Sequence, residues 1–303
     1  MKRYDFSIDE LYEGERLDKG LTLLTEEALS RSFLQKIIKD KEVYVNGKPQ
    51  KASYILKSGD EVCFETADSV IPDILPEDIP LDILYEDSDV IVVNKPKNMV
   101  VHPAPGHLSG TLVNALLYHC SGSLSGINGV LRPGIVHRID KDTTGSVIAC
   151  KNDNAHRCIA QQLKDHSITR RYRAIVHGVV KEDERTIETL IGRDPKDRKK
   201  MSARVPDGKR AVTHIKVLER FKDYTYIECR LETGRTHQIR VHMAHIGHPL
   251  LGDLVYGKNK NRFGADTQCL HAYILGFISP SLGEYIETVA PLPQYFKDYL
   301  EKL

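Results

Sequence analysis

Residues 1–66 show two helical patterns of apolar residues followed by short alternating segments. Apolar positions recur with helical spacing over 15–25 and again over 30–41, which predicts two helices joined by a short turn. Beyond them EVYVNGK alternates and ends in an Asn-Gly turn at 46–47, and SYILKSGDEVCFE predicts two further short strands. The pattern therefore indicates a compact helix-helix-strand unit that ends near Thr66.

The next segment, 67–80, breaks this pattern. It has prolines at positions 72, 76 and 80 and no basic residue. Such a composition is typical of an extended acidic linker.

From residue 81 to 303, strand-like and helix-like segments mix without a regular strand-helix-strand repeat. Helices are predicted over 111–119 and 152–166, the second capped by Asn152 or Asn154. Strands are predicted over 134–139, 146–151, 169–180, 184–192, 210–221, 224–232, 269–277 and 284–290. Residues 192–210 are strongly basic with little periodicity, and we expect a mobile surface loop that touches RNA. The whole indicates an α+β domain with a mixed, mainly antiparallel central sheet and flanking helices.

The composition excludes several classes of protein. The chain is 41% hydrophobic and 28% charged, which is typical of a folded globular protein. The start MKRYDFSIDE contains no signal-peptide stretch and the apolar runs are too short for a bilayer, so we expect a cytoplasmic protein with no membrane partner. The six cysteines form no C-x-x-C pair and are expected to be reduced structural thiols.

Charge is segregated along the chain, although the net charge is only +1. Residues 1–66 carry a net −2, residues 67–90 a net −8 and residues 91–303 a net +11, and a +5 patch lies within 28–58. Basic surfaces attract a polyanion through phosphate contacts and counterion release. On charge alone, a merely solvated surface remains the alternative.

Four histidines, at 237, 242, 245 and 248, raise the question of a metal site. They form no H-E-x-x-H motif, and the neighbouring chain supplies no clustered carboxylates. The segment from Thr236 to Gly247 instead predicts one helix, capped by the threonine and ended by the glycine. We therefore expect no metal.

Two single residues nearby are candidates for a site. Arg240 follows a strand and Gly234 and lies a turn inside the predicted helix, which would present a fixed guanidinium to an anion; a surface salt bridge is the ordinary alternative. In 170–178 the period of two puts Tyr172 on an apolar face. A tyrosine there is either an ordinary core residue or the wall of a pocket.

The segment HRIDKDTTG, 137–145, lies between two apolar runs. DKDTTG predicts a turn in which Gly145 is free to take unusual dihedral angles, so Asp140 lies at the mouth of a turn beside a strand end. On these residues alone, an Asx turn that bonds only local backbone is the favoured explanation.

The order of four motifs changes this interpretation. KPKNMVVHP (95–103), HRIDKDTTG (137–145), RRYRAIVHG (170–178) and LETGRTHQIRVHMAHIGHPLLGD (231–253) resemble the motifs of the RluA-type family of RNA pseudouridine synthases, and the resemblance covers residues 81–303. The central motif of that family reads H-R-L-D-x-x-T-S-G, so Ile139 and Thr144 are mild departures. The first sixty-odd residues resemble the αL RNA-binding motif of the ribosomal-protein S-four type, which precedes the catalytic domain in the branch acting on large-subunit ribosomal RNA.

The resemblance implies an isomerase that flips specific uridines of large-subunit ribosomal RNA out of their stack and converts them to pseudouridine. It implies Asp140 as the catalytic aspartate, Tyr172 as the active-site tyrosine and Arg240 as the partner of the aspartate. No cofactor is implied, because the isomerisation consumes no redox equivalent, phosphate or water. A covalent sugar adduct, a ring adduct and an elimination path all remain open. Candidate RNA-binding residues are Arg138, which would fill the space the base leaves, His137, which would hold the loop, and, on the amino-terminal patch, Arg31, Lys36, Lys39, Lys41 and Lys48.

Two other functions compete with this hypothesis. One is an RNA-binding or ribosome-assembly factor with an idle site, and the presence of all three catalytic candidates argues against it. The other is a metal-dependent nuclease, which would need clustered carboxylates that the motifs lack. The expected partner is large-subunit ribosomal RNA or a pre-ribosomal particle, and the family resemblance together with the lack of a coiled-coil repeat favours a monomer.

Overall fold

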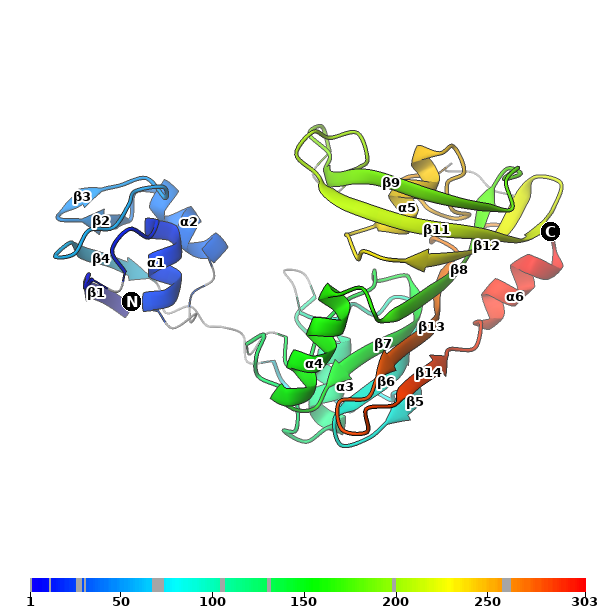
Figure 1. Ribbon diagram of the computed structural model, residues 1–303, viewed down its shortest axis with the longest axis horizontal. Coiled ribbons are helices and arrows are strands. Elements are labelled where there is room, and N and C mark those ends of the chain that lie inside the picture. The colour runs from blue at the N-terminus through cyan, green and yellow to red at the C-terminus, as the bar shows by residue number, and fades with distance from the viewer. Residues whose placement is uncertain are drawn as a thin grey trace. The chain divides into compact units, whose positions relative to one another are not determined.

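The structure is a computed structural model that describes residues 2–10, 12–25, 29, 31–66, 74–103, 107–129, 132–197, 200–257 and 263–303, without the side chains of 2, 31 and 32. The chain forms two compact units, Met1–Pro72 and Asp73–Leu303. Each is a separate fold (Figure 1). In the described part of the chain, none of the helices has the length and apolar character needed to cross a bilayer.

The first unit is a four-stranded antiparallel sheet with two helices. Its elements are β1 (Lys2–Ser7), α1 (Leu17–Leu24), α2 (Arg31–Lys39), β2 (Val43–Val45), β3 (Lys48–Pro49) and β4 (Glu61–Thr66). The strand order is β1-β4-β2-β3. Apolar side chains at helical spacing pack against alternate side chains of the strands and form the core, which includes Leu17, Leu21, Leu34, Ile37, Val43, Val62 and Phe64.

Two details of this unit differ from the prediction. The sequence did not predict β1, whose Tyr4 and Phe6 rings contact Phe64 on β4. The first of the two strands predicted in SYILKSGDEVCFE is only a single bridge between Arg16 and Ile55.

The second unit is built on one long mixed sheet. Its elements are β5 (Ile83–Glu86), β6 (Val90–Lys95), α3 (Leu112–His119), β7 (Thr144–Cys150), α4 (Asp153–Lys164), β8 (Thr169–His177), β9 (Glu184–Arg193), β10 (Met201–Ser202), β11 (Lys209–Arg220), β12 (Tyr224–Leu231), α5 (Gln238–His245), β13 (Leu270–Ile278), β14 (Tyr285–Val289) and α6 (Gln294–Glu301). The order is β10-β9-β11-β12-β8-β13-β7-β6-β5, with β14 beside β13. Only the short β7–β13 pairing is parallel, which confirms the predicted mixed, mainly antiparallel sheet with flanking helices.

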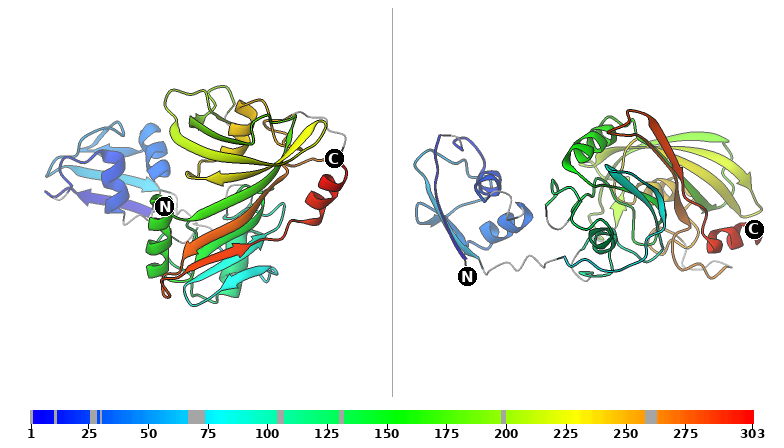
Figure 2. Two further views of the ribbon diagram at one scale, coloured as in Figure 1. Left: turned by 45° about the vertical axis from the view of Figure 1, so that its right-hand side comes forward. Right: turned by 90° about the horizontal axis from the view of Figure 1, so that it is seen from below.

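Helices cover both faces of the sheet because its central strands are apolar on both faces. Alternate residues of β6 enter two different cores, Ile91 and Val93 with α3 and Val90 and Val92 with α4. At the other end of the sheet, α5 lies against β9 and β11 (Figure 1). Figure 2 shows β8 and β13 running between these two halves of the unit.

The expected linker stays a prediction, because residues 67–73 lie outside the described residues. Residues 74–80 lie against α3: the Asn114 side chain donates to the carbonyl of Leu75, and the Glu77 amide donates to the carbonyl of Asn114. Ile74 and Leu81 pack on the core.

Three local predictions in the second unit are corrected. The strand expected over 134–139 pairs only at Ile135, because the residues after it face a cavity rather than another strand. The basic loop expected over 192–210 contains β10, which pairs with the end of β9. Helix α5 begins at Gln238, and its cap is His237 in the left-handed region (φ 55°) rather than a threonine.

Candidate active site

A cavity of about 620 Å³ lies within the second unit and collects all three predicted catalytic residues together with His137 and Arg138. Its lining includes residues from three segments that carry the predicted site: 135–143, the start of β8, and the loop and helix start over 234–240. The volume is in the range that binds a drug-sized ligand. Segments far apart in the sequence therefore meet around one space large enough for a nucleotide.

Asp140 lies in the wall of this cavity with 19% of its side chain exposed. Its carbonyl accepts a hydrogen bond from the Thr143 amide (3.1 Å), which closes the turn predicted at this position. The carboxylate does not bond the local backbone, as an Asx turn would require; its Oδ2 accepts a hydrogen bond from Arg240 Nη1 at 2.9 Å. The structure thus brings together two residues that are 100 positions apart.

The second carboxylate oxygen of Asp140 is open to a ligand. Among the described residues, Oδ1 accepts no hydrogen bond, and His237 Nε2 lies 3.8 Å from it. A carboxylate held by one oxygen keeps the lone pairs of the other available to a ligand.

Arg240 is held by a second carboxylate, which sequence reasoning missed. Its Nε and Nη2 donate to the two oxygens of Asp253 at 2.7 and 3.0 Å, and its guanidinium lies 5.2 Å from the centre of the Tyr256 ring. Burial lowers the pKa of Arg240, but the hydrogen bonds and charge of Asp253, followed by the charge of Asp140, raise it above its usual value. The guanidinium is fixed and always charged.

Asp253 is fully buried and is itself fixed by backbone. Its Oδ1 also accepts hydrogen bonds from the amides of Val255 (2.9 Å) and Tyr256 (3.1 Å). The signal in the sequence was an acidic residue in the apolar segment HPLLGD, thirteen residues after Arg240.

Tyr172 projects from β8 into the same cavity and is 7% exposed. Its neighbours on that strand face, Ala174 and Val176, lie in the main core, so the predicted alternation is confirmed. Burial raises the pKa of the Tyr172 hydroxyl, and the nearby Arg170 only partly opposes this. The phenol is therefore protonated at neutral pH.

Two residues support the segment that carries Asp140. The ring of His137 accepts a hydrogen bond from the Ile148 amide (3.1 Å), which ties the segment to β7, and burial lowers the pKa of His137 to about 3. The ammonium of Lys95, 1% exposed, donates to the carbonyl of Lys141 (2.8 Å) and to two carbonyls near its own strand end. Lys95 is the first residue of the motif KPKNMVVHP, but no local sequence pattern predicted its contact with the carbonyl of Lys141.

The remaining candidates for RNA binding lie in two places. Arg138 is exposed on the cavity lining. In the first unit the side chains of Lys36, Lys39, Lys41 and Lys48 are exposed. The side chain of Arg31 lies outside the described residues.

Three of the four histidines that suggested a metal, His237, His242 and His248, have separate hydrogen-bond partners. His237 Nδ1 lies 2.8 Å from the Tyr256 hydroxyl, the two nitrogens of His242 contact Thr213 and Thr189, and His248 contacts the carbonyl of residue 177. Within the described ranges, no three His, Cys, Asp or Glu side chains gather as metal ligands would.

The chain is similar to one family over most of this unit. The profile described as RNA pseudouridylate synthase matches residues 89–245, and the profile of the S4 domain matches residues 15–62.

Individual relatives extend the similarity over the whole chain. The sequence is 53% identical over 303 residues to an uncharacterised RNA pseudouridine synthase, YlyB, of Bacillus subtilis, with 100% of this chain and 99% of that protein covered. It is 49% identical over 295 residues to the ribosomal large subunit pseudouridine synthase D of Zymomonas mobilis, with 93% and 91% covered. A solved structure, human RNA pseudouridylate synthase domain containing 1, is similar with a TM-score of 0.57 and 28% identity over 70% of this chain and 83% of that one.

Proposed function

Because the chain belongs to the RNA pseudouridylate synthase family and is thus an isomerase of uridine in RNA, we propose that it modifies specific uridines of large-subunit ribosomal RNA. The family resemblance of the four motifs is thereby confirmed. The choice of substrate is supported by the relative from Zymomonas mobilis, whose name specifies the ribosomal large subunit, and by the S4 match. The observation that carries the catalytic part is the Asp140 carboxylate, held by Arg240 at 2.9 Å with its other oxygen open to the cavity.

The reaction needs few groups. The bond from the ribose C1′ to the uracil N1 breaks, a bond from C1′ to C5 forms, and the net proton change is loss from C5 and gain at N1. Nothing is oxidised or reduced, so we propose that the enzyme works without a cofactor. Asp140 is the catalytic residue, acting through Oδ1 on the ribose or the uracil ring, and Arg240 fixes its direction.

Tyr172 is proposed to bind the uracil rather than to remove its proton. Its ring forms part of the cavity wall, where it offers a flat surface to a base. A proton acceptor would have to be ionised, and burial raises the pKa of this phenol, which disfavours that form.

The target base has to leave its stack before it reaches Asp140, at a cost of a few kcal/mol. Arg138 is proposed to occupy the vacated space, since it is exposed two residues from Asp140. His137 is proposed to hold the same segment through its bond with Ile148.

The first unit is proposed to bind RNA through Lys36, Lys39, Lys41 and Lys48, with Arg31 as a further member. Replacing Lys36, Lys39 and Lys41 by serine should weaken RNA binding and flatten the dependence of log Kd on log salt by roughly 0.7–0.9 for each phosphate that is no longer neutralised. Lys19→Ser is the control, because Lys19 is half exposed in the same unit but already pairs with Glu15 at 2.7 Å. An unchanged slope in the triple variant would argue against this surface.

We further propose a monomer that acts in the cytoplasm on ribosomal RNA or an assembling particle.

Mapping pseudouridine in ribosomal RNA from cells with and without this protein tests the proposed substrate. In RNA from cells without the protein, at least one position of the large-subunit RNA should lack its pseudouridine. The purified protein should form pseudouridine at the same position in transcribed RNA without added metal. Loss of no position there would contradict the substrate. Tight binding without product would indicate an idle RNA-binding factor, and metal-dependent cleavage a nuclease.

A further inference from the structure

Arg170 is a buried cation in the cavity wall. It lies two residues before Tyr172 on β8, and because strand side chains alternate, both point to the same side, about 7 Å apart along the strand. Arg170 lines the same cavity and is only 7% exposed.

The hydrogen bonds of Arg170 leave part of its guanidinium unused. Its Nη2 donates to the main-chain carbonyl of Glu232 at 2.9 Å, and its buried Nε has no partner. Among the described residues it makes no ion pair within 4.0 Å. One face of the guanidinium fork therefore has donors that the protein does not use.

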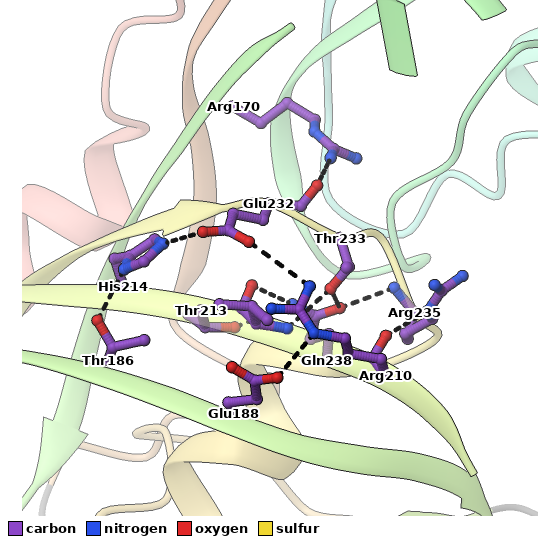
Figure 3. Close-up of polar contacts among 11 residues, drawn as sticks. Arg170, Thr186, Glu188, Arg210, Thr213, His214, Glu232, Thr233, Arg235 and Gln238 are labelled. Atoms are coloured by element: carbon purple, nitrogen blue, oxygen red, sulfur yellow. Dashed lines mark hydrogen bonds and ion pairs between the residues drawn. The ribbon is translucent and has the colours of Figure 1, made fainter. Parts of the chain in front are cut away.

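The side chain of Glu232, whose main-chain carbonyl Arg170 bonds, is engaged elsewhere. Figure 3 shows the carboxylate of Glu232 turned away from Arg170, toward His214 Nε2 at 2.8 Å and Arg210 Nη1 at 3.8 Å. Arg170 meets only the backbone of Glu232, and a carbonyl carries no net charge that would neutralise a guanidinium.

The loop that supplies this carbonyl is fixed. Gln238 accepts hydrogen bonds from the Thr233 hydroxyl (2.8 Å) and the Arg235 amide (2.9 Å) and donates to the carbonyl of Val212 (2.9 Å), as Figure 3 shows in part. Gly234 lets the loop approach closely, because a Cβ there would lie 2.8 Å from Arg170 Nη1. The guanidinium is held in one orientation before any ligand arrives.

Burial without a counter-charge is costly for a cation, and arginine does not escape the cost by losing its proton. Burial lowers the pKa of Arg170, but a guanidinium is such a strong base that the group stays charged at neutral pH. A fixed, charged and unneutralised fork in a substrate cavity is suited to an anionic part of the substrate, and the anions of RNA are its phosphates.

We propose that Arg170 binds, through the N–H groups of its guanidinium that face the cavity, a phosphate that flanks the uridine isomerised at Asp140. The inference rests on the proposed action of Asp140 on a flipped uridine. A phosphate fits better than a uracil oxygen, since only the phosphate supplies the missing negative charge. It also accounts for the position of Arg170 beside Tyr172, where base and backbone of one nucleotide are bound together.

The test uses a short form of whichever RNA the purified enzyme modifies, made with all phosphates charged or with one neutral methylphosphonate on the 5′ or the 3′ side of the target uridine. Wild-type enzyme should lose about 10- to 100-fold in kcat/KM for one of the two neutral linkages, as expected for a hydrogen bond to a charged group. Arg170→Met should show that loss with ordinary RNA and lose less than about twofold more with the neutral linkage. Arg170→Lys, which keeps the charge, should recover part of the activity.

Arg171→Met is the matched control. Arg171 is the next residue on the same strand, points to the other face and lies near Glu228 at 3.7 Å, so its loss should leave the response to both neutral linkages unchanged. The proposal is overturned if wild-type enzyme accepts both neutral linkages within about twofold, or if Arg170→Met loses as much on them as wild type does. If Arg170→Met does not fold, the kcat/KM values of wild type and Arg170→Lys on the charged and neutral linkages decide alone. A modified RNA other than ribosomal RNA would contradict the proposed substrate but leave this test intact.

Discussion

Each of two walls of one cavity contains a buried arginine, but only one of the two arginines is paired with carboxylates of the protein. On the α5 wall, where Arg240 and Asp140 line the cavity and Asp253 lies buried behind them, one guanidinium bonds two carboxylates, so the group carries a net −1. On the β8 wall, formed by Arg170, Tyr172 and the loop around Gly234, the guanidinium bonds one carbonyl and carries a net +1. The protein supplies both partners in the first case and leaves the partner to the substrate in the second.

The difference indicates separate tasks for the two walls. A shared arginine cannot neutralise two carboxylates, so Asp140 keeps negative charge and a free oxygen while its direction is fixed. The desolvation cost of buried charges is offset only when every member of the network is hydrogen-bonded. Asp253 meets this condition with the help of two backbone amides. We therefore propose that the α5 wall carries out the chemistry and that the β8 wall binds the substrate.

Among changes to the residues that support Asp140 or line the β8 wall, Arg240→Lys should have the largest effect, about 10³-fold in kcat, with RNA binding nearly unchanged. Lysine keeps the positive charge but cannot bond Asp140 and both oxygens of Asp253 at once. Single-turnover rates and RNA affinities measured together would check this. A variant that retained more than a tenth of the rate, roughly 1.4 kcal/mol of transition-state stabilisation, would show that the charge matters and its geometry does not.

Asp253→Asn should come next, with a loss of about 100-fold in kcat although Asp253 does not reach the cavity. The amide can still accept from Val255 and Tyr256, but its NH₂ group then faces the N–H donors of Arg240. Breaking a buried pair also costs about 3–5 kcal/mol, so thermal unfolding should shift down by roughly 10 °C. If Asp253→Asn and wild type had equal activity, Asp253 would have no role in positioning Arg240.

Gly234→Ala should have the smallest effect of the three changes. It alters the β8 wall rather than the α5 wall. The added methyl would lie 2.8 Å from Arg170 Nη1 and displace the guanidinium, without strain at a residue whose φ is ordinary. We expect KM to rise about 10-fold at nearly constant kcat. Gly126→Ala, where the added methyl meets open space, is the control, and a fall in kcat with constant KM would contradict the division between the walls.

Part of this site could be predicted from sequence because it depends on local pattern. The period of two placed Tyr172 on the inner face of β8, and the turn residues predicted the turn that begins at Asp140. The strand over 134–139 was wrong because its apolar residues line a cavity, and apolar pattern alone does not distinguish a cavity wall from a sheet. The predicted threonine cap was also wrong, since His237 takes the left-handed conformation and its ring is held by Tyr256.

The rest depends on contacts between distant residues. Lys95 meets the carbonyl of Lys141 across 46 positions, and Arg170 meets Glu232 across 62. No periodicity encodes such pairs, and the absence of a counter-ion beside Arg170 among the described residues is visible only once its neighbours are in place.

The central claim is that the free oxygen of Asp140 carries out the chemistry. The most direct test is pseudouridine formation by Asp140→Asn on a substrate RNA, with the Kd for that RNA measured in parallel. The amide keeps the size of the side chain and removes its charge, so the rate should fall about 10⁴-fold or more while Kd changes less than about threefold. A variant that still formed pseudouridine at a rate near that of wild type would show that Asp140 is not the catalytic residue.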